Sequence, residues 1–469
     1  MSDNTKFRPA KGMKDCLPKE TLLRQKLIRL IEHHYQLYGF QPIDTPALEN
    51  IEVLQGKGGG ENEKLMFEII KRGGDFDRAA EKWINEAQTE NEKQMRAIAD
   101  ARVRFDSSHL VEMGLRFDLT LPLARYVGNH WNDLPKPFRC SHIGQVWRAE
   151  NTQHGRMREF YQCDIDIIGG ASDAYEVELL LATDRVLKEL NVGKFKIRIS
   201  DKRLLSDLLI GMGVEGTKVA GVALALDKLD KQPVDQVWKE IELLGHSLEV
   251  LNKVDGFLKN ALNRQLDQAH FKIGEAEKLW LKIDSVRQRV HAVNPDANVV
   301  FDPLLVRGFD YYTGPVFEIN VEDKDFTFSI GGGGRYDGLI EKLGGPKNTP
   351  AVGISLGFER ILLILAEKNK AAAQALSSTV YVANNGQLER DILALAESLR
   401  SHGIQVEACL ENKKIGQQLE SAQKNGIEFA VTKFTPGNKT FTVRRLSSRQ
   451  DSEMTAEDLA KALKELEKS

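Results

Sequence analysis

The chain has few cysteines and no long hydrophobic run. Four of its 469 residues are cysteine, at positions 16, 140, 163 and 409, and no two of them form a CxxC pair. This spacing argues against a disulfide framework or a zinc site, so we expect no resident metal. No apolar stretch approaches the roughly 20 residues that span a bilayer. The opening segment MSDNTKFRPAKGMKD has no apolar signal core, which predicts a cytoplasmic protein without a membrane partner.

The chain also lacks a strong excess of charge of either sign. Its formal net charge is −3 at pH 7. This balance argues against a histone-like binder of polyanions, but it is compatible with a local basic patch for RNA. With 41% hydrophobic and 28% charged residues, the composition is that of a globular protein, and the length predicts two or three domains.

The order of helical and strand-like segments predicts three regions. Residues 1–200 and 301–370 mix strands with helices, and a charged helical insertion interrupts them at about 71–108. Residues 201–300 are almost entirely helical and predict a separate insertion. In residues 376–469 strands alternate with helices, which predicts a small α/β domain with a mainly parallel sheet.

Two strand-like stretches carry polar residues on one predicted face. In LRFDLT, alternation places Arg116, Asp118 and Thr120 together. In REFYQCDIDIIG the same rule gives one face to Arg158, Phe160, Gln162, Asp164 and Asp166. A half-exposed sheet is an open interpretation for any one strand. Several such strands in one chain favour a polar pocket floored by a sheet.

Arginines and rings elsewhere suit an anionic or zwitterionic ligand. VWRAENTQHGRMREF places Arg148 and Glu150 on a predicted strand, and guanidinium groups bind phosphate or carboxylate oxygens bidentately. Arg360 falls in the first turn of a predicted helix, where the helix dipole disfavours a cation unless an anion lies beside it. In LVRGFDYYTGPVFEI, an arginine, an aspartate and two tyrosines lie close together in a strand-like stretch. We interpret this stretch as part of a site that binds a small zwitterion.

Five segments resemble the class II aminoacyl-tRNA synthetases, and most closely the histidyl-tRNA synthetases. GFQPIDTPALE, VWRAENTQHGRMREFYQCDIDIIG and AVGISLGFERILLIL resemble the three class motifs. LVRGFDYYTGPVFEI and GGGGRYDGLIEKLGG resemble the two histidine-specific motifs. The resemblance covers nearly the whole chain, with two departures. The 71–108 insertion is longer than the usual hairpin. Asp118 and Asp166 stand where many bacterial members carry Glu, and these two aspartates resemble the family's other, eukaryote-like form.

The resemblance implies both a fold and an activity. The expected fold is an α+β catalytic domain with a mixed, mainly antiparallel sheet and a helical insertion, followed by a C-terminal α/β anticodon-binding domain at 376–469. The implied activity is ATP-dependent attachment of L-histidine to tRNA(His) through a histidyl-adenylate. Mg²⁺ would assist, and the first motif would form a homodimer.

The resemblance also implies roles for individual residues. The implied catalytic residues are Arg307, Arg148 and Arg360. The implied histidine-binding residues are Asp118, Leu119, Thr120, Arg148, Gln162, Asp166, Arg307, Tyr311 and Tyr312. The implied ATP-binding residues are Arg148, Glu150, Phe160 and Arg360. Contacts to the tRNA acceptor stem are implied for Gln153 and Arg158.

One alternative shares the same catalytic core. The regulatory subunit of ATP phosphoribosyltransferase resembles histidyl-tRNA synthetase without being a ligase. Such subunits lack the C-terminal domain and often the catalytic arginines. This chain keeps both, which favours the ligase.

Overall fold

The structure is a computed structural model, and the chain divides into two compact units, Met1–Leu365 and Ala366–Ser469. It describes residues 7–56, 65–89, 110–230, 232–263, 265–305, 311–326, 328–368, 377–411 and 413–468. The helical region predicted at 201–300 lies within the first unit.

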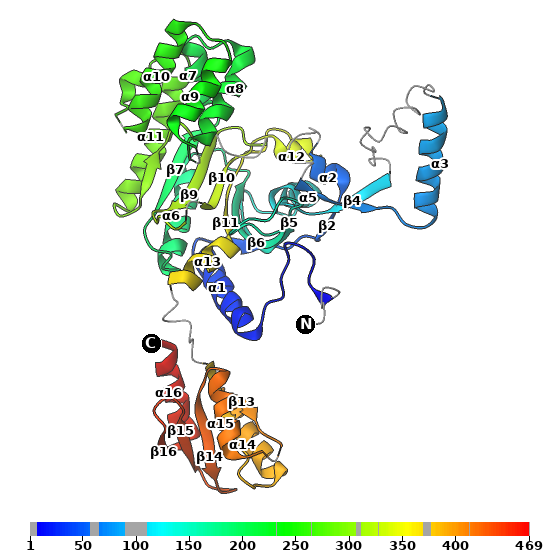
Figure 1. Cartoon of the computed structure of the whole chain (residues 1–469), viewed down its shortest axis with the longest axis vertical. Coiled ribbons are helices and arrows are strands. Elements are labelled where there is room, and N and C mark those ends of the chain that lie inside the picture. Colours follow the sequence, from blue (N-terminus) through cyan, green and yellow to red (C-terminus); the bar gives the residue numbers. More distant parts are fainter. Residues whose placement is uncertain are drawn as a thin grey trace. The chain divides into compact units, whose positions relative to one another are not determined.

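An eight-stranded sheet forms the centre of the first unit (Figure 1). In sheet order its strands are β1 (Gln41–Pro42), β5 (Phe138–Trp147), β6 (Glu159–Ile168), β11 (Ala351–Gly357), β10 (Ser329–Arg335), β9 (Pro315–Val321), β7 (Phe195–Asp201) and β8 (Val299–Phe301). The pairs at the two edges are parallel, and the pairs between them are antiparallel. The predicted mixed, mainly antiparallel sheet is confirmed.

Long helices cover one face of this sheet. They are α1 (Pro18–Leu37), α6 (Ala174–Glu189), α11 (Ala276–Val293) and α13 (Phe358–Lys368). Proline at the first position of α1 starts that helix without the loss of a helical hydrogen bond. Leu27 and Ile31, one turn apart on α1, share an apolar core with Ile165 and Ile167 of β6. The helix side of β6 is therefore apolar.

The opposite face of the sheet carries smaller elements. They are the helices α2 (Ile51–Gln55), α5 (Thr120–His130) and α12 (Leu339–Lys342), and a small sheet in the order β2 (Leu48–Asn50), β4 (Val111–Leu115) and β3 (Phe67–Ile70). Leu123 and Val127 of α5 pack with Phe117, Tyr311 and Tyr336 in a separate apolar cluster. Asp118, Gln162 and Asp166, three of the polar residues predicted for a site, lie on this side of the sheet.

A group of helices forms its own core within the first unit (Figure 1). It consists of α7 (Leu204–Gly211), α8 (Gly216–Leu226), η4 (Asp227–Asp230), α9 (Val234–Leu243), α10 (Leu248–Leu262), η5 (Gln268–Phe271) and the start of α11. Leu208, Val222, Ile241 and Phe271 are fully buried in it. The other predicted insertion begins with α3 (Gly74–Thr89), and residues 90–108 of that prediction lie outside the described residues.

The C-terminal unit is a five-stranded mixed sheet with helices. Its elements are β12 (Ser377–Val382), α14 (Glu389–Ser401), β13 (Gln405–Ala408), α15 (Ile415–Lys424), β14 (Ile427–Phe434), β15 (Thr440–Arg445), β16 (Gln450–Thr455) and α16 (Ala456–Lys468). β12 pairs in parallel with β13 and β14, but β14, β15 and β16 are antiparallel. The prediction of a mainly parallel sheet is wrong there, because the turns after Phe434 and Arg445 are too short for a crossover helix.

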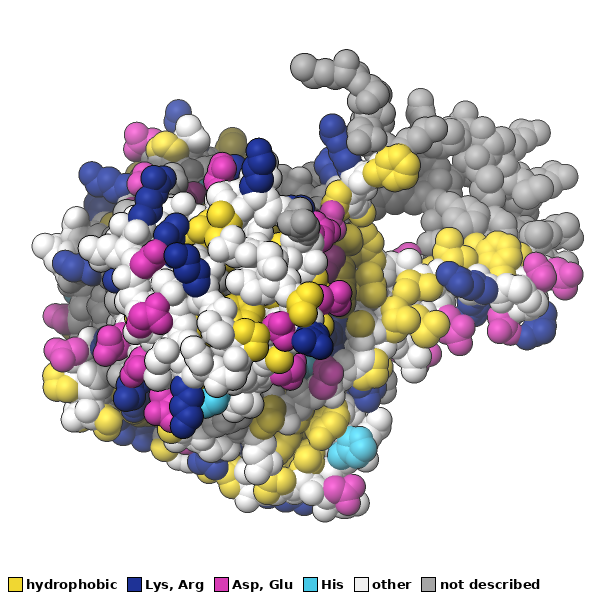
Figure 2. Space-filling view, turned by 90° about the horizontal axis from the view of Figure 1, so that it is seen from below, with side chains coloured by type: hydrophobic (Ala, Val, Ile, Leu, Met, Phe, Trp, Pro, Cys, Tyr) yellow, Lys and Arg dark blue, Asp and Glu magenta, His cyan; other side chains and the backbone are white. Residues whose placement is uncertain are grey.

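The surface carries charges of both signs. On the face drawn in Figure 2, basic and acidic side chains are interspersed over much of the area. In the portions of the chain that the structure describes, no helix combines the length and apolar character needed to cross a membrane.

Candidate active site

The polar face of β6 is buried. Gln162, Asp164 and Asp166 are 7%, 3% and 4% exposed, while Cys163 and Ile165 between them enter the core on the helix side. The predicted strand and its alternation are confirmed. The alternative interpretation, a half-exposed sheet, is excluded for this strand, because the smaller elements on this side of the sheet cover its polar face.

Asp166 lies at the deep end of this row. It accepts a hydrogen bond from the hydroxyl of Tyr336, with 2.6 Å between the oxygens. Burial raises the pKa of Asp166 to about 7, although the bond from Tyr336 acts in the opposite direction. The sequence reasoning assigned no role to Tyr336, yet its segment GGGGRYDG was one of the two histidine-like motifs and was the signal that could have found it.

Glycines give Asp166 its space. A Cβ added to Gly353 would lie 1.8 Å from Oδ1 of Asp166, and a Cβ on Gly333 would lie 2.1 Å from the carbonyl oxygen of Gly353. Both distances are far shorter than a van der Waals contact, and the second is to a backbone atom. The strands β10 and β11 can therefore pack closely against each other and against Asp166 only because these two positions have no side chain.

Asp118 lies in a turn that faces the same region. The prediction of a strand through LRFDLT is wrong beyond Leu115, where β4 ends, because α5 begins at Thr120. Oδ1 of Asp118 accepts the backbone N–H of Leu121 at 3.2 Å, within the first turn of α5. Burial raises the pKa of Asp118 to about 6, against the lowering effect of that bond and of Arg148. Leu119 beside it is buried.

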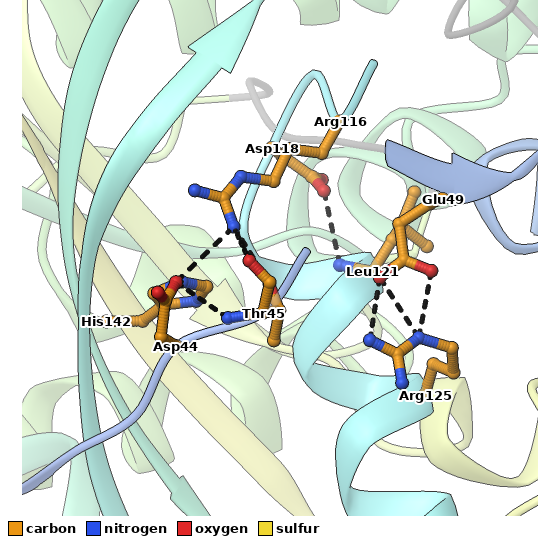
Figure 3. Close-up of polar contacts among 8 residues, drawn as sticks. All are labelled: Asp44, Thr45, Glu49, Arg116, Asp118, Leu121, Arg125 and His142. Atoms are coloured by element: carbon orange, nitrogen blue, oxygen red, sulfur yellow. Dashed lines mark hydrogen bonds and ion pairs between the residues drawn. The ribbon is translucent and has the colours of Figure 1, made fainter. Parts of the chain in front are cut away.

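The turn is anchored by charged neighbours on its other side (Figure 3). Arg116 points away from Asp118, and its guanidinium donates to the Thr45 hydroxyl at 3.0 Å and to the Gln145 carbonyl at 2.9 Å. In α5, Arg125 forms a bidentate pair with Glu49 of β2 at 2.7–3.0 Å. Bonds on both sides fix the position of Asp118.

Two tyrosines close the region. Tyr311 donates from its hydroxyl to Oδ2 of Asp118 at 3.1 Å, and its ring lies 5.0 Å from that of Tyr312 and 6.1 Å from that of Tyr336. The prediction that Tyr311 and Tyr312 lie in a strand is wrong, because β9 begins at Pro315. Ring packing holds them instead of a strand ladder. Arg307, in the same motif, lies outside the described residues.

Arg148 lies next to this carboxylate-rich region. It follows the last residue of β5, so the prediction that Arg148 and Glu150 are on a strand is wrong by a few residues. The Arg148 side chain donates to the Phe117 carbonyl at 3.0 Å, and its guanidinium carbon lies 5.0 Å from the ring centroid of Phe160. Burial lowers the pKa of Arg148, and Asp118 and Glu150 oppose that effect.

The turn between β5 and β6 carries Glu150 and the two predicted acceptor-stem residues, Gln153 and Arg158. Arg158 donates to the backbone carbonyl of Glu150 at 3.0 Å, and the Glu150 carboxylate pairs with Arg156. Gln153 is exposed and closes the turn through backbone bonds with Arg156. The predicted acceptor-stem residues therefore lie on the turn next to Arg148.

Arg360 connects a different element to this turn. It lies in the first turn of α13, as predicted, and its guanidinium donates to the Gly155 carbonyl at 3.1 Å and the Ser329 carbonyl at 2.5 Å. Its charge also lies 5.4 Å from the ring centroid of Phe328. The first turn of the helix thus presents a guanidinium beside the β5–β6 turn.

The assembled site has two chemical characters. One end gathers buried carboxyl groups and phenols, which suit a ligand with several N–H donors. The other end gathers guanidinium groups and a ring, which suit phosphate oxygens and a base. Among the residues that the structure describes, no three His, Cys, Asp or Glu side chains are grouped to hold a metal ion. The sequence reasoning left Asp164 and Ser355 without a role in this site.

The chain is similar to known proteins along most of its length. A family model described as histidyl-tRNA synthetase matches residues 85–361, and a model described as anticodon binding domain matches residues 379–466. A histidine–tRNA ligase of Christiangramia forsetii is 33% identical over 467 residues, covering 97% of this chain and 98% of that protein. A probable histidine–tRNA ligase of Tropheryma whipplei is 41% identical over 374 residues, covering 77% and 81%.

Solved structures agree in fold. The crystal structure of histidyl-tRNA synthetase from Nostoc sp. PCC 7120 has a TM-score of 0.76 and 27% identity, covering 98% of this chain and 99% of that one. An ATP phosphoribosyltransferase regulatory subunit/histidyl-tRNA synthetase from Bacillus halodurans C has a TM-score of 0.67 at 18% identity, covering 88% and 96%, and shows likeness of fold alone. The extent of the family match and the near full-length relatives show that the chain belongs to the histidyl-tRNA synthetase family.

Proposed function

We propose that the chain is a histidine–tRNA ligase that activates L-histidine with ATP and transfers it to tRNA(His). The observation that carries this proposal is the joined site, in which Arg148 interacts electrostatically with Asp118 at one side and stacks on Phe160 at the other. Such a site can hold an amino acid and a nucleotide next to each other.

The carboxylate-rich end would bind histidine. Asp118, Thr120 and Gln162 would hold the α-amino group, and Asp166 and Tyr312 would read the imidazole ring. Leu119 and Tyr311 would line the same pocket. A buried polar pocket discriminates by hydrogen bonds and rejects analogues that lack them by roughly 10⁴ or more, so a separate editing site is not needed.

The arginine end would bind ATP. Arg148 would contact the α-phosphate and the histidine carboxylate, Glu150 and Phe160 would contact adenine, and Arg360 would hold the γ-phosphate. In the first step a carboxylate oxygen of histidine attacks the α-phosphorus, and pyrophosphate leaves with the electrons of the broken P–O bond. In the second step a terminal ribose hydroxyl of the tRNA attacks the histidyl carbonyl, and AMP leaves.

The protein would contribute position and charge to both steps. Reactants held in line avoid the entropy of encounter, and guanidinium groups stabilise the charge that develops on phosphate oxygens. Arg307 would bridge the reacting carboxylate and the α-phosphate. We treat Mg²⁺ as part of the MgATP substrate, because phosphate oxygens supply ligands that it prefers.

The tRNA would contact both units. Gln153 and Arg158 on the β5–β6 turn would meet the acceptor stem. In the domain scheme we propose, residues 1–200 and 301–370 are catalytic, 201–300 are a helical insertion, and 376–469 bind the anticodon arm. A homodimer would form through the first class motif, which contains β1 and β2.

One assay tests the ligase against its alternative. ATP–pyrophosphate exchange should be measured with each standard amino acid. We expect exchange with histidine and background rates with the others. A regulatory subunit of the phosphoribosyltransferase type would bind histidine without exchange, and that result would reject the ligase. The retained Arg148, Arg360 and C-terminal unit favour the ligase.

A further inference from the structure

Two side chains on the floor of the site each have an oxygen that the fold leaves unused. In the part of the chain that the structure describes, Oε1 of Gln162 and Oδ1 of Asp164 are buried and have no hydrogen-bond partner. Their residues are 7% and 3% exposed. Buried polar atoms are nearly always hydrogen-bonded in folded proteins, because an unpaired one loses its bonds to water without replacement. Two such atoms on one strand face point to a missing partner.

The strand register places Asp164 in the middle of this floor. Asp164 lies directly opposite His142 on β5 and opposite Ser355 on β11, and side chains paired in this way lie on the same face of a sheet. Along β6, Asp164 comes between Gln162 and Asp166, which the proposed function assigns to the two ends of histidine. Neighbours on one strand face are about 6.6 Å apart, so Asp164 lies within reach of a ligand that spans them.

The surroundings of Asp164 are those of the amino-acid pocket. After burial, Asp164 raises the pKa of the Tyr312 hydroxyl more than Asp166 or Asp118 does. Burial and the neighbouring Asp166 in turn raise the pKa of Asp164 itself, with Asp118 adding to the effect. Three carboxyl groups therefore share one poorly solvated space, which a bound cation would stabilise.

The neighbouring polar groups are already engaged. The Ser355 hydroxyl accepts a bond from the Gln162 amide nitrogen at 2.7 Å, and its hydrogen bond to the Asp164 carboxyl lowers the pKa of that group against the effect of burial. The Thr120 hydroxyl also hydrogen-bonds Tyr311. The free acceptors that remain are Oε1 of Gln162 and Oδ1 of Asp164.

We propose that Asp164 is a further substrate-binding residue, whose Oδ1 accepts a hydrogen bond from the α-ammonium group of the bound amino acid. An ammonium group has three donors and no acceptor. Asp118, Oε1 of Gln162 and Oδ1 of Asp164 supply three acceptors, and one ligand group accounts for both unused oxygens. The inference rests on the proposed function, because it takes histidine as the ligand.

Calorimetry with two ligands tests the assignment. L-histidine carries the α-ammonium, whereas imidazole lactic acid has a hydroxyl in its place and keeps the same ring and carboxylate. We expect Asp164→Asn in the full-length protein to weaken L-histidine binding by at least about tenfold, the scale of a lost charge-assisted bond. Binding of imidazole lactic acid should stay close to that of the unsubstituted protein. Asp164→Ser should show the same selective loss and serves if the Asn variant does not fold.

A matched control removes a similar carboxyl group elsewhere. Asp184 of α6 is 1% exposed and also has an oxygen without a hydrogen-bond partner among the described residues. Asp184→Asn should leave the affinities for both ligands unchanged, even if it lowers the melting temperature. Retained ATP binding in each variant reports that the site is folded.

Other outcomes separate the two proposals. Equal weakening of both ligands by Asp164→Asn would overturn the assignment in favour of a contact to the ring. Unchanged affinity for both would show that a buried water satisfies Asp164, which also overturns it. If the unsubstituted protein failed to bind L-histidine, the proposed function itself would fail, and the inference with it.

Discussion

Asp166 makes folding sensitive to pH at the scale of a single residue. Its pKa is about 7 in the folded chain, raised by burial, against an ordinary value of 3.8. Between these values the folded chain holds a proton that the unfolded chain has lost. Folding therefore becomes less favourable as the pH rises through about 4 to 7.

Asp166→Asn should remove this dependence. Relative to the unsubstituted protein, the variant should gain stability as the pH rises from about 5 to 8, by up to about 1.4 kcal/mol per pH unit within the titration window. Melting temperatures of both proteins without ligand give the comparison. His142, whose pKa burial lowers to about 4, acts with the opposite sign below about pH 6.5 but is common to both proteins. Parallel curves across the range would contradict the prediction.

Arg307 is the residue on which the proposed chemistry depends most. If its guanidinium bridges the attacking carboxylate and the α-phosphate, Arg307→Ala should slow adenylate formation by about 10² to 10³. Arg307→Lys should recover little, because an ammonium cannot offer a planar fork to two oxygens. Single-turnover adenylate formation measures the effect, with histidine and ATP affinities as controls. A surface arginine would change stability by no more than about 0.5 kcal/mol and leave the rate intact, and that result would remove Arg307 from the mechanism.

At the scale of elements, the Glu359 side chain bonds to the backbone of β6 just beyond the point where its partner strand β11 ends. β11 ends at Gly357, opposite Gln162 of β6, and the chain turns directly into α13. The next residue of β6 toward its start, Tyr161, donates its backbone N–H to the Glu359 carboxylate at 2.8 Å. Glu359 also binds Arg24 of α1 at 2.5 Å. This pair joins α1, β6 and α13 at the proposed ATP end.

Arg24→Met tests this junction. The guanidinium lies 5.3 and 5.1 Å from the ring centroids of Tyr161 and Phe358. Its loss therefore removes charge and packing from Tyr161 and Glu359, the sequence neighbours of Phe160 and Arg360. We expect the KM for ATP to rise by about tenfold, equivalent to about 1.4 kcal/mol, with the KM for histidine little changed.

A second arginine pair provides the control for that experiment. Arg139 pairs with Glu178 at 3.1 Å and lies 5.5 Å from the Tyr175 ring centroid. It stands opposite Ile167 in the strand ladder, on the helix-covered face and away from the site. Arg139→Met should leave both KM values unchanged. Equal changes in the two KM values of Arg24→Met, or a loss of stability alone, would reject a positioning role.

The elements also show where sequence reasoning works. The alternation of polar and apolar residues in β6 correctly predicted its two faces. The apolar face packs on the helices and the polar face is covered by the smaller elements, so each residue type is fixed to one side of the sheet. LRFDLT and the segment before β9 are also strand-like in sequence. The local bond from the Leu121 N–H to Asp118 and the long-range bond from the Tyr311 hydroxyl to Asp118 override that preference. The Tyr336–Asp166 bond joins residues 170 positions apart. No local pattern reports such a contact, and the motif resemblance assigned no role to Tyr336.

At the scale of the whole molecule, the two units have separate cores. The apolar clusters of the C-terminal unit contain residues from 380 onward, and those around the large sheet end at Leu365. A chain that ends after residue 370 keeps α13 intact and should therefore fold.

That truncated chain should separate the two proposed steps. We expect it to form adenylate at rates near those of the full-length protein, provided that sedimentation shows the same oligomeric state. Charging of tRNA should fall by about a hundredfold or more, because the second of two linked binding modules is lost. Full charging efficiency would contradict the proposed division of labour between the units.

The close approach of Gly333 and Gly353 has a consequence for inheritance. Every missense change at a glycine codon adds at least one carbon, and at these positions that carbon would fall within 2.1 Å of an oxygen. Selection should therefore tolerate only synonymous changes there. Allele surveys of natural populations should show silent variation at both codons and an absence of amino-acid variants, in contrast to exposed glycines such as Gly256, where a Cβ meets no atom within 4 Å.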